Sequence, residues 1–271
     1  MMTNRKIGII GCGNMGEALL GRLSKVMEKS ISIMASELDA VRRAAILEKH
    51  KIIVEIDNNY LVKYCDVIIL AVKPQDLENV LRQEVCCGVS EKKLLISIAA
   101  GVSTKYIESV VGGNVPVMRA MPNMPAVIGE AMTAICAGSG AAKADVELTR
   151  EIFSTIGDVV EVEEKHMDAV TAISGSGPAY FFYLVEALAE AAEKLGLDTK
   201  TSEELAIKTA IGSSKLLDEL KEHPSILRKK VTSKGGTTEA ALKVFDEKSL
   251  KKIIEEAALA ACNRSKELSK K

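Results

Sequence analysis

The chain lacks any apolar run long enough to cross a membrane. The longest, "VIILAV" at residues 67–72, has only the length of one buried strand. A charged leader followed by an apolar stretch is also missing, because a strand pattern begins almost at the first residue, and we expect no signal peptide. These absences argue against a membrane protein and predict a cytoplasmic one.

An excess of charge of either sign is missing as well. The chain of 271 residues has 36 basic and 37 acidic side chains, which gives a formal net charge of −1. This balance provides no electrostatic reason to expect a nucleic acid or an anionic membrane as a partner. The length allows a sizeable core and favours two domains.

Metal-binding motifs are absent from the spacing of the six cysteines. Cys86 and Cys87 are adjacent and cannot easily bridge each other. The others lie in apolar segments, at Cys12, Cys65, Cys136 and Cys262. We therefore expect mostly buried, free thiols in a reducing cytoplasm, and no metal site.

Short β-rich runs alternate with helical patterns from Lys6 to Val162. Continuous apolar runs between turn residues are typical of strands covered on both faces, and the helical patterns between them predict a mostly parallel sheet. The predicted strands are residues 6–11, 30–36, 51–56, 66–72, 93–100, 115–121, 132–138 and 158–162.

The second half of the chain has helical patterns throughout. "PAYFFYLVEALAEAAEKLGL" is predicted to begin near Pro178 and to end at Gly196. In the following helix Thr201 and Glu204 have the spacing of a capping box, and Pro224 is expected to end it.

The segment "KIGIIGCGNMGEAL" combines a strand, a Gly-x-Gly-x-x-Gly loop and a helix. Gly11 permits a tight turn, Gly13 lets a pyrophosphate approach the backbone, and Gly16 lets helix and strand pack closely. The helix N-terminus, at Asn14 and Met15, then receives the phosphates. Within a βαβ series this favours a dinucleotide over a purely structural turn. Methyltransferases that use S-adenosylmethionine also have a glycine-rich first loop.

These patterns together predict an α/β fold. An N-terminal Rossmann-type, doubly wound, mostly parallel sheet is expected at residues 1–163, followed by an all-helical C-terminal domain at residues 164–271.

The end of the second strand carries two conflicting signals about the coenzyme. Ser36 and Glu37 lie about twenty residues beyond Gly16, where a side chain that faces the ribose is expected. A carboxylate at Glu37 would accept hydrogen bonds from a ribose diol and favour NADH. Ser36, with Arg42 or Arg43, would instead hold the 2′-phosphate of NADPH. Either residue alternatively caps the next helix.

Two further strand ends have small or loop-like residues where an open sheet binds its ligand. The predicted cofactor contacts there are Ala71, Val72, Lys73, Pro74, Ala99, Ala100 and Gly101. Small residues let a flat cofactor lie against the backbone. Lys73 is either a phosphate or ribose contact or a solvated loop lysine.

Three other segments resemble the motifs of one known family. "MPNMP" at residues 121–125, "AISGSGPAYFFYLVEAL" at residues 172–188 and "VTSKGGTTEAAL" at residues 231–242 are similar to segments of pyrroline-5-carboxylate reductases. The similarity extends from about Lys6 to Lys266, and the last motif is far more specific than the glycine loop.

The resemblance implies that the protein reduces the cyclic imine 1-pyrroline-5-carboxylate to L-proline, the last step of proline biosynthesis, with NADPH or NADH. It also implies a helical dimerisation domain that interlocks two subunits, and dimers of this family often assemble further. It adds three cofactor contacts: Asn58 (with Asn59 as an adjacent alternative), Met121 and Asn123. It implies that Thr238, the catalytic residue, hydrogen-bonds the ring nitrogen of the substrate. It also implies that Thr237 and Thr238 contact the product.

The last motif also has a direct physical interpretation. Backbone amides at a helix N-terminus hold a carboxylate well, and the substrate carries one. Gly235 and Gly236 allow close approach to the backbone, while Ser233, Thr237 and Thr238 add hydroxyl groups. The alternative is a plain Ser/Thr N-cap after a glycine turn.

The chemistry needs little more than orientation, because a protonated imine is already an electrophile. We expect the substrate to enter protonated. The three histidines, His50, His166 and His223, are each expected to be structural or exposed. The run from Ser174 to Ser176 either lies near the nicotinamide or forms a tight helix cap.

Several residues depart from the family pattern. Lys234 replaces a usual proline, and Lys229 and Lys230 stand where polar or acidic residues are more usual. Relatives with NADPH-type contacts have a small hydroxyl residue in place of Glu37, so coenzyme preference stays open. A β-hydroxyacid dehydrogenase would need a lysine within residues 179–183, which is missing. Another imine reductase or a non-catalytic nucleotide sensor is the remaining alternative.

Overall fold

The computed structural model describes residues 5–26, 32–52, 54–112 and 114–268. They form two compact units. The sheet unit comprises Met1–Ser176 and Ala261–Lys271, and the helical unit comprises Gly177–Ala260. This spatial division does not coincide with the predicted boundary after residue 163, and it returns the end of the chain to the sheet unit. Each unit is described by itself.

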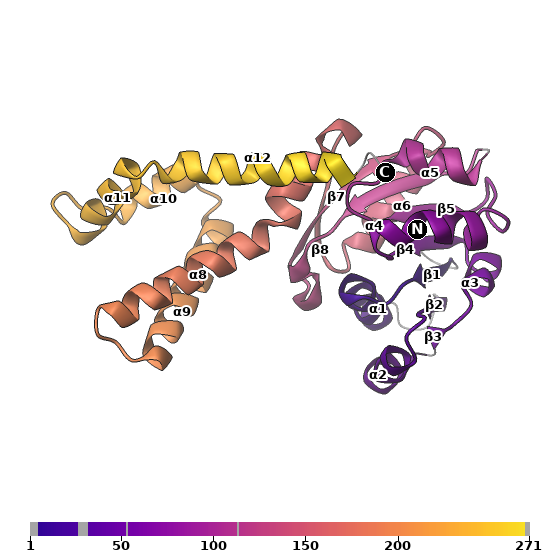
Figure 1. Cartoon of the computed structure of the whole chain (residues 1–271), viewed down its shortest axis with the longest axis horizontal. Helices are drawn as coiled ribbons and strands as arrows, with labels where there is room; N and C mark the ends of the chain where they lie inside the picture. The colour runs from indigo at the N-terminus through magenta and orange to yellow at the C-terminus, as the bar shows by residue number, and fades with distance from the viewer. Residues whose placement is uncertain (1–4, 27–31, 53, 113, 269–271) are drawn as a thin grey trace. The chain divides into compact units, whose positions relative to one another are not determined.

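The sheet unit is built on one eight-stranded sheet with the order β3-β2-β1-β4-β5-β6-β7-β8 (Figure 1). The strands are β1 (Lys6–Ile10), β2 (Ser32–Ser36), β3 (Val54–Glu55), β4 (Val67–Leu70), β5 (Leu94–Ser97), β6 (Val117–Met121), β7 (Ala131–Ala137) and β8 (Gly157–Glu161). The strands β1 to β6 run parallel in the order of a Rossmann fold, while β7 is antiparallel to β6. Each predicted run coincides with one of these strands, although most strands are shorter than the run and β7 and β8 begin one residue earlier. Residues 30, 31 and 53 of the predicted runs lie outside the described residues.

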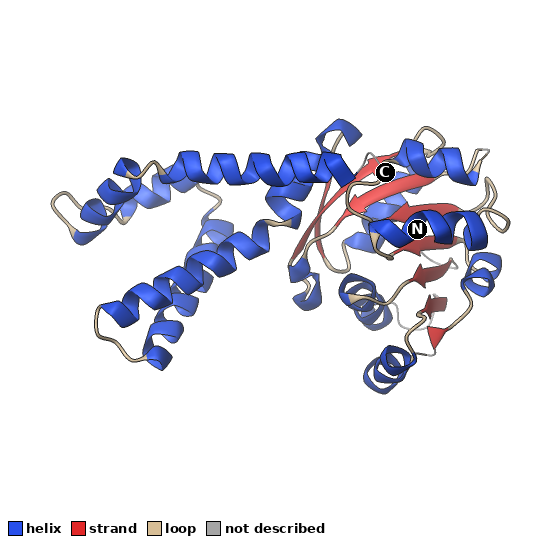
Figure 2. Ribbon diagram, viewed as in Figure 1, coloured by secondary structure: helices blue, strands red, loops and turns tan. Residues whose placement is uncertain are grey.

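Helices cover both faces of this sheet (Figure 2). They are α1 (Asn14–Val26), α2 (Ala40–His50), α3 (Asn58–Tyr64), α4 (Pro74–Val80), η1 (Leu81–Val85), α5 (Thr104–Val111), η2 (Met124–Ile128), α6 (Lys143–Phe153), η3 (Glu164–His166), α7 (Met167–Val170) and η4 (Thr171–Gly175). Ile7 and Ile9 of β1 pack in one core with α1, α2 and α6, whereas Ile10 packs in another with α3, α4 and α5. Burial on both faces explains the continuous apolar runs of the strands.

The helical unit has no sheet among its described residues. Its helices are α8 (Gly177–Lys194), α9 (Thr199–Leu220), α10 (Pro224–Lys230), α11 (Thr237–Glu247) and most of α12 (Leu250–Leu268). Gly196, at φ +99°, follows the end of α8 as predicted. The predicted capping box is wrong, because α9 begins earlier and Asp198 accepts the Thr201 amide at 3.1 Å. Pro224 begins α10 instead of ending α9.

The six cysteines are free, and three of them are deeply buried. Burial raises the pKa of Cys12 and of Cys136 to about 12 and that of Cys65 to about 11. These three thiols are therefore unreactive at neutral pH. Within the described residues, no helix has both the length and the apolar character needed to span a membrane.

Candidate functional site

The first and third loop glycines form a tight junction with the helix that follows, at the carboxyl end of β1. Gly11 has φ +91°, and a Cβ there would lie 3.0 Å from the Ala71 carbonyl oxygen. A Cβ on Gly16 would lie 2.1 Å from the Gly11 carbonyl oxygen. Both positions therefore require glycine, as the packing roles proposed from the sequence demand.

Gly13 differs, since a Cβ at this position would meet no atom within 4 Å. Its carbonyl oxygen accepts the Glu17 amide at 2.8 Å, the first bond inside α1. The amides of Asn14, Met15 and Gly16 precede that bond and are free of intrahelical partners by their position. Open space beside a helix N-terminus fits a pyrophosphate, so the residues here suit a bound dinucleotide.

Glu37 connects the end of β2 to the glycine loop. Its carboxylate accepts the Cys12 amide at 3.0 Å and the Asp39 amide at 3.1 Å. The two nearby arginines are engaged by neutral groups. Arg43 donates to the backbone carbonyls of residues 37 and 38, both at 2.7 Å, and Arg42 donates to Asn14 Oδ1 at 3.2 Å.

Ser36 and Asn58 come together at the same edge but face inward. They are only 1% and 6% exposed. The Ser36 hydroxyl donates to Asn58 Oδ1, and Asn58 Nδ2 donates to Glu84 Oε2 at 2.5 Å. Asn59 instead bonds Asp57 at the surface. Sequence reasoning missed Glu84, because it belongs to no motif and reaches Asn58 from η1.

The loop after β4 packs against the glycine loop. Ala71 and Val72 supply the atoms nearest to Gly11, while Pro74 opens α4 with Lys73 as its N-cap residue. Lys73 is exposed and makes no side-chain cap hydrogen bond. The structure thus gives Ala71 and Val72 a packing role and leaves the Lys73 ammonium at the surface of this edge.

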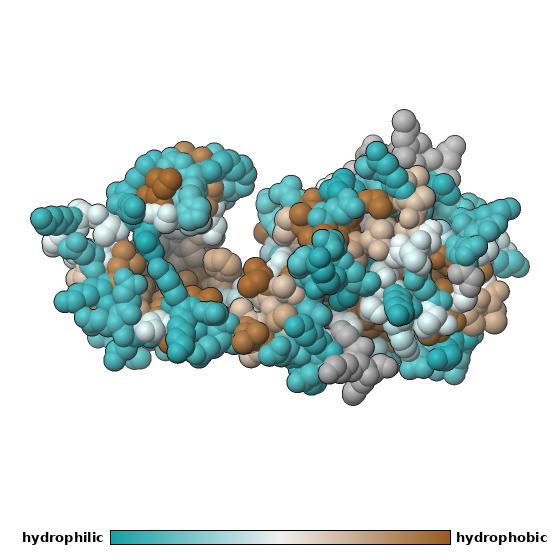
Figure 3. All heavy atoms as spheres, turned by 90° about the horizontal axis from the view of Figure 1, so that it is seen from above, coloured by the Kyte–Doolittle hydropathy of each residue, from teal (hydrophilic) through white to brown (hydrophobic). Residues whose placement is uncertain are grey.

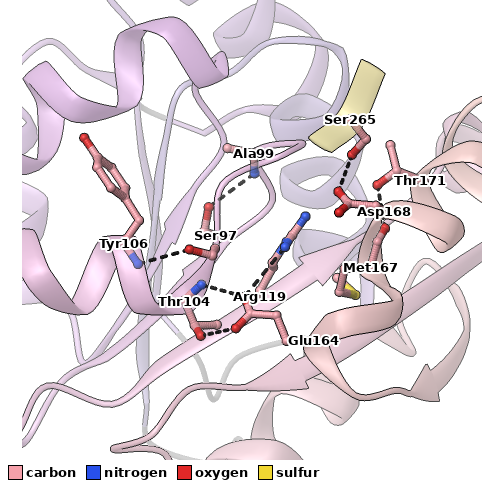
Figure 4. A network of polar contacts seen from close by, with 11 residues as sticks. Ser97, Ala99, Thr104, Tyr106, Arg119, Glu164, Met167, Asp168, Thr171 and Ser265 are labelled. Carbon is pink, nitrogen blue, oxygen red and sulfur yellow. Dashed lines mark hydrogen bonds and ion pairs between the residues drawn. The ribbon is translucent and has the colours of Figure 1, made fainter. Parts of the chain in front are cut away.

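Gly101 packs against the last turns of α12. At φ +77°, a Cβ on Gly101 would lie 2.9 Å from Leu268 Cβ and 3.1 Å from the Ser265 carbonyl oxygen. Ser265 also donates its hydroxyl to Asp168 Oδ1 at 2.6 Å (Figure 4). This contact with α12 explains the glycine without a cofactor. Ala99 is 4% exposed, and Ala100 lies between Ala99 and Gly101 in the sequence.

A buried polar network lies beside this contact (Figure 4). Glu164 accepts both the amide and the hydroxyl of Thr104 at 2.6 Å. Arg119, 4% exposed, places Nη1 3.6 Å from Glu164 Oε1. The network links β6, the start of α5 and η3. No sequence motif pointed to it, since Arg119 stands inside an apparently ordinary strand.

The "MPNMP" and "SGSG" segments meet at the end of β6. Asn123 Nδ2 lies 3.2 Å from the Ser174 carbonyl oxygen and 3.3 Å from its hydroxyl. Asn123 Oδ1 accepts the Met132 amide at 3.0 Å. A Cβ on Gly175 would lie 2.6 Å from the Met121 methyl group. The two motifs quoted from the sequence therefore form one packed corner of the sheet unit.

The Gly-Gly-Thr-Thr turn lies in the helical unit and begins α11. Gly236 is the N-cap residue and makes no side-chain cap bond, so the Ser/Thr N-cap alternative is wrong. The Gly235 amide donates to Glu239 Oε2 at 2.7 Å, and the Gly236 amide donates to the Ser233 carbonyl oxygen at 3.0 Å.

These bonds correct one detail of the sequence interpretation. The amides of Gly235 and Gly236 are occupied within the turn, whereas those of Thr237 and Thr238 lie at the α11 N-terminus before the first intrahelical bond, from the Ala240 amide to the Gly236 carbonyl oxygen. Gly235 has φ +72° with no atom within 4 Å of a Cβ. The glycines therefore shape the turn, and the threonine amides are left without intrahelical partners.

The histidines lie in three different settings. His50 Nε2 lies 3.3 Å from Glu17 Oε1, His223 caps α10 through Ser225, and His166 ends η3. In the part of the chain that the structure describes, no group of three or more His, Cys, Asp or Glu side chains is arranged to hold a metal ion.

The strand order, the glycine loop and the open helix N-terminus are those of a dinucleotide-binding Rossmann domain. Residues 6–101 match the family model described as "NADP oxidoreductase coenzyme F420-dependent". Residues 164–268 match the model described as "Pyrroline-5-carboxylate reductase dimerisation".

Similar proteins point to one family. The pyrroline-5-carboxylate reductase of Synechocystis sp. is 41% identical over 98% of this chain and 99% of its own length. That of Methanosarcina acetivorans is 40% identical over the whole of both chains. The solved reductase of Coxiella burnetii superposes with a TM-score of 0.91 at 36% identity, covering all of both chains. The Plasmodium falciparum reductase with NADP bound gives 0.87 at 30% identity, covering 99% of this chain and all of that one. The chain belongs to the pyrroline-5-carboxylate reductase family.

Proposed function

We propose that this protein reduces 1-pyrroline-5-carboxylate to L-proline. The observation that carries the proposal is the α11 N-terminus, where a glycine-shaped turn leaves the Thr237 and Thr238 amides without intrahelical partners and Thr238 adds a hydroxyl group. A substrate with a carboxylate next to a ring nitrogen matches this pair of groups. Membership in the family supports the same substrate.

Each group in the turn has a distinct task in the proposed reaction. The threonine amides and the positive end of the α11 dipole hold the substrate carboxylate. The Thr238 hydroxyl bonds the ring nitrogen and fixes the orientation of the C=N bond. Bound NADH or NADPH supplies the hydride. Because the protonated imine is already electrophilic, no strong acid is required of the protein.

The coenzyme is held by the sheet unit in this proposal. The α1 N-terminus beside Gly13 receives the pyrophosphate, and Glu37 faces the adenosine ribose. Ala71, Val72 and Lys73 border the same edge. Met121 and Asn123 shape the corner where β6 ends.

We also infer that the protein is a homodimer joined through its helical unit. Phe181, Phe182 and Tyr183 of α8 are more than half exposed, and such a cluster of aromatic side chains is typical of a surface that another protein chain covers. The match of residues 164–268 to a dimerisation model supports a second copy of this chain as the partner.

The reaction is tested with a Thr238→Ala variant. We expect kcat/KM for 1-pyrroline-5-carboxylate to fall by about a hundredfold, the magnitude seen when a bond that orients the reacting group is lost. The dissociation constants of NADH and NADPH stay unchanged, since Thr238 is not part of the sheet unit. Thr199→Ala, at the start of α9, is the matched control and retains full turnover. Wild-type protein that binds coenzyme but turns over no pyrroline, or a Thr238→Ala variant with normal kcat/KM, would contradict the proposal.

A further inference from the structure

The edge of the sheet at β2 carries a carboxylate in a fixed position. Glu37 presents a half-buried carboxylate that is held in place by the Cys12 and Asp39 amides. The hydrogen-bond partners that hold this carboxylate are both backbone amides, which fix its position more firmly than flexible side chains would. A ribose diol, which donates two hydroxyl hydrogens, finds a suitable acceptor here.

The side-chain donors of Ser36 and Asn58 at this edge are both bonded to acceptors of the protein itself. The Ser36 hydroxyl is bonded to Asn58 Oδ1, and the Asn58 amide group is bonded to Glu84. Burial of Ser36 at 1% exposure removes its hydroxyl from a ligand at the surface. The alternative in which Ser36 holds a 2′-phosphate therefore loses its main donor.

The two arginines beside this edge are bonded to neutral groups of the protein. Arg43 Nη1 donates to two backbone carbonyls at 2.7 Å, and Arg42 donates to Asn14. Each guanidinium keeps further N–H donors, so the arginines alone do not exclude a phosphate. The carboxylate of Glu37 and, one contact further away, that of Glu84 oppose the added charge.

We propose that Glu37 and Glu84 together make this site select NADH over NADPH, with Glu84 acting through Asn58. This inference rests on the proposed function in that it assumes a nicotinamide dinucleotide as coenzyme. A phosphate monoester carries nearly two negative charges at neutral pH. Bringing it to an edge with two fixed carboxylates costs Coulomb energy that a ribose hydroxyl does not.

Glu84 has a second effect besides its charge. By accepting from Asn58 Nδ2 it fixes the amide so that Oδ1, an acceptor, faces Ser36. With a neutral side chain at position 84 the Asn58 amide is held less firmly, and Ser36 loses a fixed acceptor. Glu84 is thus a positioning residue, one contact removed from the coenzyme.

The test measures the dissociation constants of NADH and NADPH by fluorescence titration of the full-length protein, without pyrroline. We expect wild-type protein to bind NADH at least about tenfold more tightly than NADPH. Glu37→Gln should lower the ratio of the NADPH to the NADH dissociation constant about tenfold, and Glu84→Gln should lower it about threefold. Glu84→Asp, which keeps the charge, restores most of the selectivity. Glu48→Gln removes a carboxylate from the exposed face of α2 and leaves the ratio unchanged. Because these interactions are electrostatic, the wild-type ratio also shrinks as salt is raised.

Two outcomes would overturn the inference. The first is wild-type protein that binds NADPH as tightly as NADH. The second is a Glu84→Gln ratio no different from that of Glu48→Gln, which would remove Glu84 from the selection. A protein that selects NADH but turns over no pyrroline would instead refute the proposed reaction and leave this inference intact.

Discussion

The sheet unit and the helical unit treat their large apolar side chains in opposite ways. Phe153 and Ile9 in the sheet unit are fully buried, whereas Phe182 and Tyr183 on α8 are 66% and 73% exposed. In the helical unit, Ala206 and Leu227 are the buried hydrophobic residues among those described. Hydrophobic atoms are accordingly visible on its surface (Figure 3).

The difference indicates where each unit obtains its stability. A sheet covered by helices on both faces completes its own core within one chain. Helices that leave aromatic residues in water gain little from folding alone and become stable when another surface covers them. The sheet unit should therefore behave as an independent domain, and the helical unit as half of an interface.

A charge placed on α8 should have the largest effect, because it should change the oligomeric state of the protein. Phe182→Glu would put a carboxylate into the proposed dimer interface, where its desolvation opposes association. We expect the variant to sediment as a monomer at micromolar concentration, with coenzyme binding retained. Phe182→Leu keeps an apolar side chain and should stay dimeric. A Phe182→Glu protein that remains a stable dimer would remove α8 from the interface.

A cavity in the sheet unit should have the next largest effect. Phe153→Ala removes a fully buried ring from the core on the α6 face and is expected to lower the free energy of unfolding by about 3–5 kcal/mol. Urea denaturation followed by circular dichroism measures it. The loss should be the same at every protein concentration, because this core lies within one chain. A loss that varied with concentration would mean that the sheet unit also depends on the partner.

A smaller effect is expected in the turn that begins α11. Glu239→Gln weakens the bond to the Gly235 amide, a charge-assisted contact at 2.7 Å on an exposed surface. We expect KM for the pyrroline to rise about fivefold, equivalent to about 1 kcal/mol, with kcat and coenzyme affinity unchanged. Glu247→Gln, at the other end of α11, is the control. A fall in kcat alone would show that Glu239 acts on the chemical step and not on the shape of the turn.

The smallest effect concerns acid sensitivity in the sheet unit. The hydrogen bond from Lys49 lowers the pKa of Glu17 below its ordinary 4.5. The stabilisation is therefore present above pH 4.5 and disappears as the pH falls through the lower, folded-state pKa. Lys49 is largely exposed, so Glu17→Gln should cost less than about 1 kcal/mol at pH 7 and a smaller amount at pH 2. Thermal melts at the two pH values compare them, and an equal cost at both would rule out the ionic origin.

Much of the cofactor edge could be predicted because its signals are local. Gly11 and Gly16 are required by contacts with residues close in the chain or on the neighbouring strand, and a glycine spacing encodes them directly. Glu84 could not be found in this way. It reaches Asn58 from the π-helix η1, and the position of η1 depends on its packing against α3. The spacing of residues in the sequence does not encode this packing.

The sequence by itself determined the eight strands, the helical second half and the open position at Gly13, because apolar periodicity and glycine conformation act over a few residues. Only the tertiary structure decided that β7 turns antiparallel, that α12 ends against Gly101, and that the Gly235 amide is already bonded. Each of these depends on which groups meet in space after the chain has folded. Hydrogen-bond partners are shared out at that stage, and a linear pattern cannot specify which donor remains free.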